Sequence, residues 1–464
     1  MSDQPKPISS ADLSDALQEL VNLAQVPRPD PPFKQLLTDH FGADPSGLPS
    51  IVENFDLTDH PNLQIALDAY LEGEGRSGTT LGITSPHKRY MGIGLSDLVG
   101  ARSTDDAPTP GPVEYLTVAL GDDSLLTCVR NGLYLIRDRE GPLAALITKM
   151  EQGSWQTLTV EVLAPERTTG ERFLADLRHS MKQKNVYRGA TLEMSQEPYG
   201  PLQVEIRKLP EIPRERVVLP EGVLERIERH TLDFSRHSKK LLQAGRHLKR
   251  GLLLHGPPGT GKTLTIMYLA GRLQGRTALL VTGQGQGLLK RVCSMARALQ
   301  PSMVVLEDVD LIAAERTRGE IGCAPLLFDL LNEMDGLGED VDVVFVLTTN
   351  RPDLLEPALA SRPGRIDQAI EVPLPDGASR LRLLELYSEG LELGMRSLEP
   401  YVARTEGASG AFIRELLRKA ALFAADEGDS LIVEDQHLDE ALHELLVEGG
   451  VLTKSLLGAE TSDL

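Results

Sequence analysis

The fold is decided by HGPPGTGKT at residues 255–263, which directly follows the apolar stretch GLLL at 251–254. Its spacing, G-x-x-x-x-G-K-T, is that of a phosphate-binding loop ending in Lys262 and Thr263. Such a loop lies between a strand and a helix. Glycines let backbone N–H groups turn toward phosphate, and the helix N-terminus adds positive potential. The lysine reaches the β- and γ-phosphates and the threonine hydroxyl binds Mg²⁺. We therefore predict a nucleotide site at the carboxyl end of a strand.

Short apolar stretches alternate with helical sequence on both sides of this loop. The predicted strands are GLLLHG at 251–256, ALLVTG at 278–283, MVVLEDVD at 303–310 and DVVFVLTTN at 342–350. Short apolar strands separated by helices indicate a parallel, doubly wound sheet with helices on both faces. The expected fold class is thus α/β, a P-loop sheet followed by a small α-helical domain.

The N-terminal half has a different pattern. Residues 11–24 and 62–73 have helical periodicity, whereas the sequence from 114 alternates and is rich in β-branched residues, as in hairpins. A helix is predicted over 168–185 and one more strand over 202–209. The chain is therefore expected to divide into a mostly helical segment (1–80), an α+β domain (81–208), a large α/β domain (209–376), an α-helical domain (377–450) and a flexible tail (451–464).

Composition narrows the class of protein. The 464 residues carry a net charge of −20, which argues against nucleic-acid binding because phosphate backbones favour Lys/Arg patches. No apolar run approaches the roughly 20 residues that cross a bilayer, so membrane insertion is not expected. Three widely spaced cysteines indicate a reducing compartment, and the N-terminus has no signal pattern. A cytoplasmic protein is expected.

The sequence GPPGTGKT, with the motifs that follow it, resembles that of the AAA ATPases of the AAA+ superfamily. The resemblance covers roughly residues 223–450, about half of the chain. It implies ATP and Mg²⁺ as cofactors and ATP hydrolysis as the activity. The loop residues expected to bind the nucleotide are Gly256, Pro257, Pro258, Gly259, Thr260, Gly261, Lys262, Thr263 and Leu264.

Two adjacent carboxylates end the third predicted strand, in VVLEDVDL at 304–311. In the family this strand ends in Asp and then Glu, the first associated with the metal and the second polarising the attacking water. Here the order is reversed, as Glu307 and Asp308. Both acids remain, so the resemblance implies a Mg²⁺ site of Thr263, Glu307 and Asp308.

The reversed order leaves two interpretations open. Small shifts of strand or water can absorb roughly an ångström, although misplacement of this size can lower a rate ~10²-fold. We expect an ATPase, and whether the swapped acids slow its hydrolysis does not follow from the sequence; the alternative is a nucleotide-binding switch that hardly turns over. The stretch LEDVD at 306–310 is similar to that of the mitochondrial AAA ATPase that translocates the folded Rieske iron–sulfur protein, and to that of a group of bacterial AAA ATPases.

Further positions match the family. Asn350 resembles the residue that orients the water or touches the γ-phosphate, and it ends a predicted strand, where α/β sheets bind ligands. Arg362 and Arg365 resemble two arginines that act on the γ-phosphate of the adjacent subunit, where a guanidinium stabilises charge and is worth ~10³–10⁵ in rate. Gly410 and Ala411 match positions that approach the adenine. This resemblance implies a homo-oligomeric ring, a hexamer.

The loop after the second predicted strand departs from the family. Residues 283–287 read GQGQG, without the aromatic residue that grips extended chains in threading rings. We therefore expect a ring that remodels or translocates a protein client, selected by residues 1–208, more than a processive unfoldase. The alternative is an ATP-binding assembly module with little turnover. The residues expected to carry hydrolysis are Lys262, Thr263, Glu307, Asp308, Asn350, Arg362 and Arg365. The client's identity does not follow from the sequence.

Overall fold

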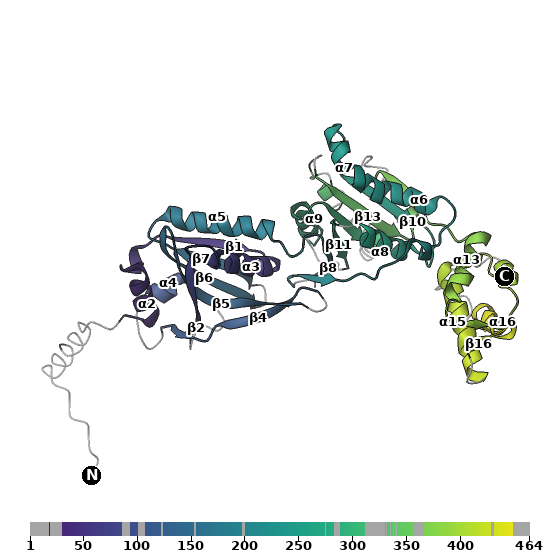
Figure 1. Ribbon diagram of the computed structural model, residues 1–464, viewed down its shortest axis with the longest axis horizontal. Helices are drawn as coiled ribbons and strands as arrows, with labels where there is room; N and C mark the ends of the chain where they lie inside the picture. Colours follow the sequence, from purple (N-terminus) through teal and green to yellow (C-terminus); the bar gives the residue numbers. More distant parts are fainter. Residues whose placement is uncertain are drawn as a thin grey trace, which may run out of the picture. The chain divides into compact units, whose positions relative to one another are not determined.

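The computed structural model divides the chain into two compact units (Figure 1). The first consists of Met1–Val118 with Leu126–Asn185, and the second of Ala119–Leu125 with Val186–Leu464. Each unit contains its own sheet and its own cores. The structure describes residues 18, 30–85, 93–100, 107–121, 124–152, 155–196, 200–273, 275–282, 288–310, 330, 332–334, 336, 338, 341–355, 366–427 and 431–448.

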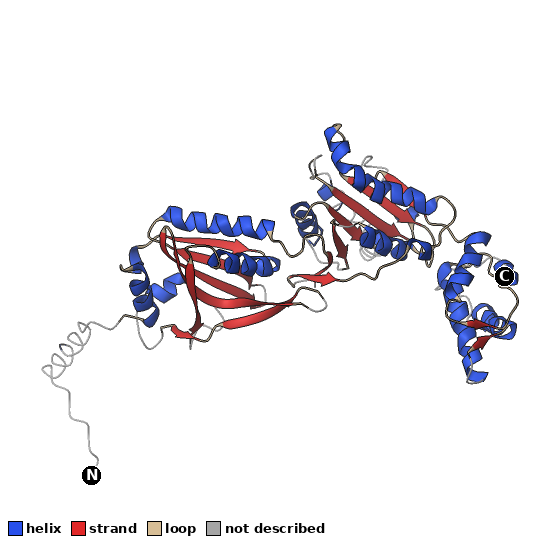
Figure 2. Ribbon diagram, in the orientation of Figure 1, coloured by secondary structure: helices blue, strands red, loops and turns tan. Residues whose placement is uncertain are grey.

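The first unit is an antiparallel sheet with helices on both faces (Figure 2). The strand order is β1-β7-β6-β5-β2-β3, and β4 also pairs with β5. The strands are β1 (Ser50–Phe55), β2 (Ser77–Thr84), β3 (Thr109–Gly111), β4 (Glu114–Ala119), β5 (Leu125–Asp138), β6 (Gly141–Gln152) and β7 (Trp155–Leu163). The helices are α2 (Pro32–Phe41), α3 (His60–Leu71), α4 (Leu95–Gly100) and α5 (Arg167–Gln183), with short 3₁₀ turns at Pro45–Gly47 and Leu57–Asp59.

Alternation along the central strands explains the two covered faces. On β6, Leu143 and Ala145 are buried with α3 and α5, whereas Ala144 and Leu146 are buried with α2 and α4. Side chains of a strand point alternately to its two faces, so an uninterrupted apolar run fits a strand that is covered on both sides.

The second unit contains the predicted doubly wound sheet. Its order is β14-β10-β13-β12-β11-β8-β9, and every described pair is parallel except β8–β9. The strands are β8 (Thr191–Gln196), β9 (Leu202–Arg207), β10 (Arg250–His255), β11 (Thr277–Val281), β12 (Ser302–Leu306), β13 (Val343–Thr349) and β14 (Gln368–Glu371). This confirms the fold class expected from the sequence.

Helices cover both faces of this sheet. They are α6 (Val223–Glu228), α7 (Phe234–Gln243), α8 (Lys262–Arg272) and α9 (Leu288–Ala298), with a 3₁₀ turn at Arg214–Arg216 and a π-helical turn at Arg229–Asp233 between α6 and α7. Residues of α9 share a core with Phe345 and Leu347 of β13, whereas α6 and α8 share another core with Val344 and Val346.

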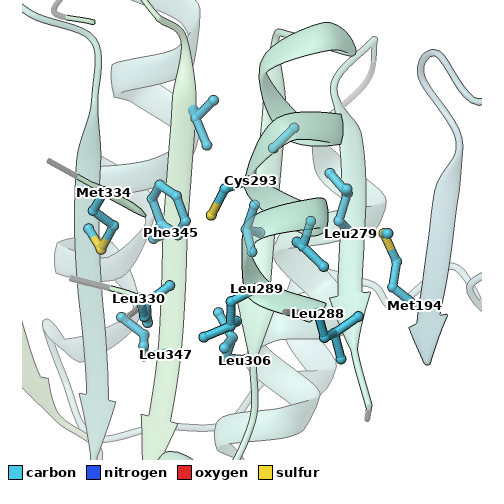
Figure 3. Packing of buried hydrophobic residues seen from close by; sticks show 14 of the residues in the cluster. Met194, Leu279, Leu288, Leu289, Cys293, Leu306, Leu330, Met334, Phe345 and Leu347 are labelled. Atoms are coloured by element: carbon cyan, nitrogen blue, oxygen red, sulfur yellow. The ribbon is translucent and has the colours of Figure 1, made fainter. Parts of the chain in front are cut away.

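The boundary between the units differs from the one expected at residue 208. Strand β8 pairs in parallel with β11, from Ala278↔Thr191 to Val281↔Met194, so it extends the second sheet. Met194 is fully buried in the same core as Leu279 and Cys293 (Figure 3). A strand was expected over 202–209 but not over 191–196, and the partner of β8 lies 87 residues further along the chain, beyond the reach of local patterns.

A small helical domain follows β14. It contains α13 (Gly377–Tyr387), α14 (Glu399–Arg404), α15 (Gly410–Glu427), α16 (Asp435–His443) and a π-helical turn at Glu444–Glu448. Two strands of two residues each, β15 (Glu392–Leu393) and β16 (Ile432–Val433), pair in parallel and were not expected. In the described part of the chain, no helix combines the length and the apolar character that a membrane span requires.

A buried arginine ties the amino ends of three strands of the second sheet. Arg276, which precedes β11, is 5% exposed. Its guanidinium donates to the carbonyl oxygen of Ser302 at 2.9 Å and forms an ion pair with Asp342 at 2.8 Å. It also donates to the hydroxyl of Ser235 on α7. Removing one partner of such a buried pair costs about 3–5 kcal/mol, because the other charge remains buried.

One carboxylate of the first unit is held in an unfavourable environment. Burial, and the nearby Asp56, raise the pKa of Asp59 to about 6, just before α3. An acid with a raised pKa in the folded state destabilises the fold above that pKa, where it must ionise. The cost disappears below the unfolded pKa, where both states are protonated.

We predict that Asp59→Asn stabilises the first unit by about 1–2 kcal/mol at pH 7, and that the gain vanishes as the pH falls from about 6 to 4. Partial solvent exposure keeps the gain below the roughly 3 kcal/mol of a full shift. Urea unfolding followed by the fluorescence of Trp155, the chain's one tryptophan and a residue of β7, measures it. Asp39→Asn, at an exposed position of α2, is the control. Equal stability at pH 7 would contradict the prediction.

Candidate nucleotide-binding site

A cavity of about 660 Å³ lies where the carboxyl ends of the second sheet meet the helical domain. Of the positions expected from the sequence, it is lined by Pro258, Gly259, Thr260, Gly261, Lys262, Thr263, Leu264, Asp308, Asn350, Gly410 and Ala411. Gly256, Pro257 and Glu307 are not among its lining residues, although all three contact residues that are. Arg362 and Arg365, together with the Gly/Gln loop at 283–287, lie outside the described residues.

The loop at 256–261 has a backbone that requires glycine. Gly256 has φ 140°, and a Cβ atom there would lie 2.3 Å from the carbonyl oxygen of Val372. Gly259 and Gly261 have φ of 76° and 96°, in the left-handed region that glycine adopts without steric cost. Helix α8 begins directly after this loop, so its first N–H groups face the cavity where phosphate would bind. The loop therefore fits a nucleotide phosphate group.

Lys262 places its ammonium group at the centre of this loop. The residue is 6% exposed, and its Nζ donates to the carbonyl oxygens of Gly256 and Pro257 at 2.8 Å each. Burial lowers the pKa of Lys262, while the negative charges of Asp308 and Asp310 act in the opposite direction. Since a buried cation needs compensating charge or hydrogen bonds, and the hydrogen bonds of Lys262 to Gly256 and Pro257 are to carbonyl oxygens, the site favours an anion beside it, as phosphate would provide.

Glu307 contacts the loop from the end of β12. Its carboxylate accepts a hydrogen bond from the side chain of Thr263, the first residue after Lys262. Burial raises the pKa of Glu307 above its ordinary value, Asp308 adds to this, and the Thr263 hydrogen bond opposes it. Among the described residues, no group of three or more His, Cys, Asp or Glu could hold a metal by itself. Mg²⁺ is commonly held by one or two carboxylates together with substrate phosphates, and Thr263 and Glu307 fit that arrangement.

Asp308 points to the other predicted polar residue of the site. The Nδ2 group of Asn350 donates to Oδ1 of Asp308 at 3.2 Å. The backbone N–H of Asp308 donates to the hydroxyl oxygen of Thr348 at 2.9 Å. Asp308 also has φ 46°, an uncommon backbone conformation for a residue other than glycine. The structure thus brings Asp308 and Asn350 together at one side of the cavity.

Asp310 was not assigned a role from the sequence. It is 6% exposed, and its Oδ1 accepts from the Thr349 hydroxyl at 2.8 Å and from the Asn350 backbone N–H at 3.2 Å. The available signal was a third acid in VVLEDVDL, two residues after Asp308. Such a signal identifies no partner, because the strand that supplies Thr349 and Asn350 lies about 40 residues away.

The helical domain contacts the loop through the start of α15. The Ala411 N–H donates to the Gly259 carbonyl oxygen at 3.1 Å. Ser409 caps the helix, since its hydroxyl accepts from the Phe412 N–H at 3.2 Å. This contact places Gly410 and Ala411 at the cavity wall.

An apolar part of the wall was missed by sequence reasoning. It is formed by Val218, Leu219 and Pro220, which precede α6, and by Leu383 and Tyr387 of α13. Apolar and aromatic side chains are the usual lining for the flat face of a base. No sequence motif marked them, because they come from a proline-rich join and from a helix that carries no motif.

We predict that Gly259→Ala weakens ADP binding at least tenfold. A Cβ atom there would lie 2.6 Å from Oγ of Ser409 and 2.9 Å from Cβ of Ala411, at a φ that is strained for alanine. Calorimetric titration with ADP measures the affinity. Gly271→Ala is the control, because no heavy atom lies within 4 Å of its added Cβ and alanine favours the α8 helix by about 0.5–1 kcal/mol. Equal affinities in the two variants would refute the prediction.

Comparison with known proteins agrees with this geometry. The model of the ATPase family associated with various cellular activities (AAA) matches residues 252–374. The proteasome-activating nucleotidase of Methanothermobacter thermautotrophicus is 30% identical over 302 residues, which are 59% of this chain and 73% of that protein. That of Thermococcus kodakarensis is 34% identical over 44% of this chain and 54% of its own length. The 26S proteasome regulatory subunit S10B homolog B of Arabidopsis thaliana is 35% identical over 42% and 52%.

The extent of these matches defines what they establish. The chain spans about half the length of the last two relatives, whereas it covers nearly three quarters of the Methanothermobacter protein. The similarity supports ATP hydrolysis and an oligomeric, ATP-driven role in protein remodelling. With a phosphate loop, the Asp308 carboxylate and a polar strand end around one cavity, the chain belongs to the AAA family of ATPases.

Proposed function

We propose that this AAA ATPase forms a homo-hexameric ring in the cytoplasm, hydrolyses Mg·ATP at sites shared between adjacent copies, and uses the turnover to remodel or translocate a protein client. The observation that carries the proposal is that Lys262, Asp308, Asn350 and the start of α15 line the same cavity. A cavity with a phosphate loop but no carboxylate would support binding alone, whereas this one supports hydrolysis.

Each residue then has a defined task. Lys262 and the loop N–H groups would hold the phosphates, and Thr263 and Glu307 would hold Mg²⁺, which would supply positive charge to neutralise the phosphate oxygens. Asp308 accepts a proton from the attacking water, whose oxygen bonds to the γ-phosphorus as ADP leaves. Asn350, hydrogen-bonded to Asp308, orients that water. The reversed order of the acids is thus compatible with one acid beside the metal and one beside the water.

The arginines complete the site from a neighbouring copy. Arg362 and Arg365 match the family motif in LASRPGRID at 359–367. A guanidinium fixed beside the γ-phosphate stabilises the charge that develops during transfer. If these side chains act on an adjacent copy, hydrolysis depends on assembly, and an isolated copy binds ATP without efficient turnover.

The client is proposed from the first unit and from the loop that follows β11. The first unit has a separate sheet and separate cores, so it can present its own binding surface. The GQGQG sequence at 283–287 provides no aromatic side chain to grip an extended chain. Together with the LEDVD resemblance to the ATPase that translocates a folded protein, this favours a folded client. The similarity to proteins named proteasome-activating nucleotidases is a second reason to propose that the client is a protein.

We predict that steady-state ATP hydrolysis per chain rises with protein concentration, and that Asp308→Asn and Arg362→Ala each lower it at least ~10²-fold while ADP affinity stays within about threefold. A phosphate-release assay measures turnover, and Arg396→Ala, at an exposed position of the helical domain, is the control. If the wild-type protein binds ADP but does not hydrolyse ATP at any protein concentration, the alternative is favoured, in which ATP binding orders an assembly and turnover matters little.

Mixing the two inactive variants tests the shared site directly. In a mixed ring, an Asp308→Asn copy supplies Arg362 to the intact acids of an Arg362→Ala copy. Part of the activity should therefore return. A site completed within one chain would give no recovery at any mixing ratio.

A further inference from the structure

Asp308 is held in a backbone conformation that few residues accept. Among the described residues, positive φ occurs at glycines and at Asp308 alone. Left-handed backbone crowds the Cβ atom, and Asp and Asn tolerate it best because their short polar side chains bond locally. A conformation of this kind persists only when surrounding contacts determine it, and it is concentrated at functional sites.

Two hydrogen bonds hold Asp308 in this conformation, and both come from the end of β13. The hydroxyl oxygen of Thr348 accepts from the Asp308 N–H at 2.9 Å, and the Asn350 amide donates to the Asp308 carboxylate at 3.2 Å. Thr348 is 1% exposed and is one of the residues that line the cavity. The first bond fixes the backbone of Asp308 and the second fixes its side chain.

Asp310 fixes Asn350, the residue whose side chain bonds to Asp308. Its carboxylate accepts from the Asn350 N–H and from the Thr349 hydroxyl, and it is buried away from the cavity lining. Since Asn350 donates to Asp308, the three acids of the EDVD stretch have different tasks. Glu307 contacts the phosphate loop, Asp308 faces the cavity, and Asp310 fixes the strand end that supports Asp308.

We propose that Thr348 and Asp310 are positioning residues for hydrolysis, and that the left-handed backbone at residue 308 is what lets an aspartate serve where the family has glutamate. The left-handed backbone directs the short side chain of Asp308 toward the attacking water, and the hydrogen bond from the Asp308 N–H to the Thr348 hydroxyl stabilises that backbone conformation. The inference rests on the proposed function, because it assigns the support for Asp308 as the acid that accepts the proton from water.

If the backbone at residue 308 is adapted to aspartate, then restoring the family's order, Asp before Glu, should impair hydrolysis in this chain. Glutamate at 308 would carry its longer side chain on a left-handed backbone, and aspartate at 307 would lie further from Thr263. The double variant Glu307→Asp/Asp308→Glu therefore lowers kcat at least tenfold, instead of raising it. A kcat equal to or above that of the wild type would overturn the explanation of the reversed order.

Thr348 is tested by steady-state ATPase kinetics and ADP calorimetry on the full chain. Thr348→Val removes the acceptor at almost constant shape; we expect kcat to fall at least tenfold, with KM and the ADP Kd within about twofold. Thr348→Ser keeps the acceptor and should retain kcat within about threefold. Thr231→Val is the matched control, a fully buried threonine whose hydroxyl donates to the Ile227 carbonyl oxygen away from the cavity.

The role of Asp310 is tested independently by two variants. Asp310→Asn keeps a carbonyl oxygen for the Thr349 and Asn350 donors, whereas Asp310→Ala removes it. We expect kcat to fall further in the alanine variant than in the asparagine variant, again with little change in ADP affinity.

The outcomes separate this inference from the proposed function. Wild-type kcat in Thr348→Val, equal losses in Thr348→Val and Thr231→Val, or no rescue by serine would overturn the positioning role alone. A wild-type protein that binds ADP but does not hydrolyse ATP would overturn the proposed function, and this inference with it.

Discussion

Parallel pairing of three neighbouring strands is the constraint on which the rest of the site depends. In the register of β12 and β13, Leu306 lies opposite Leu347, and in that of β10 and β13, His255 lies opposite Thr349. The chain segments that leave these strands therefore emerge at one edge. There the phosphate loop, the acids and Asn350 lie close together, as is usual for ligand sites of open α/β sheets. A change of one residue in either register would separate the acids from the loop.

Close packing of neighbouring backbone and side chains against the phosphate loop fixes the conformation of that loop. The carbonyl oxygen of Val372 approaches Gly256 so closely that a side chain there would overlap it, and Ser409 and Ala411 approach Gly259 in the same way. The loop is thus enclosed between the end of β14 and the start of α15. Glycine is required at both points because another backbone occupies the space of its side chain.

Sequence patterns predicted the parts of the molecule that depend on local chemistry. The loop motif, the apolar strands and Asn350 at a strand end each follow from neighbouring residues. The parts that depend on distant residues were not predictable. They include the pairing of β8 with β11, the left-handed backbone of Asp308, and the wall formed by Val218–Pro220. The acid order was visible in the sequence, but its support by Thr348 required the pairing of β12 with β13. The roles of Arg362 and Arg365 remain predictions.

The Arg276 contacts have a consequence for how the sheet can move. They tie the amino ends of β11, β12 and β13, opposite to the edge that carries the cavity. Strands tied at one end and joined by ladder hydrogen bonds do not slide past each other without breaking those bonds. Any adjustment at the cavity edge therefore takes the form of a change in twist that grows with distance from Arg276. The largest displacements then fall on the residues that contact the phosphates, and the smallest on the buried ion pair.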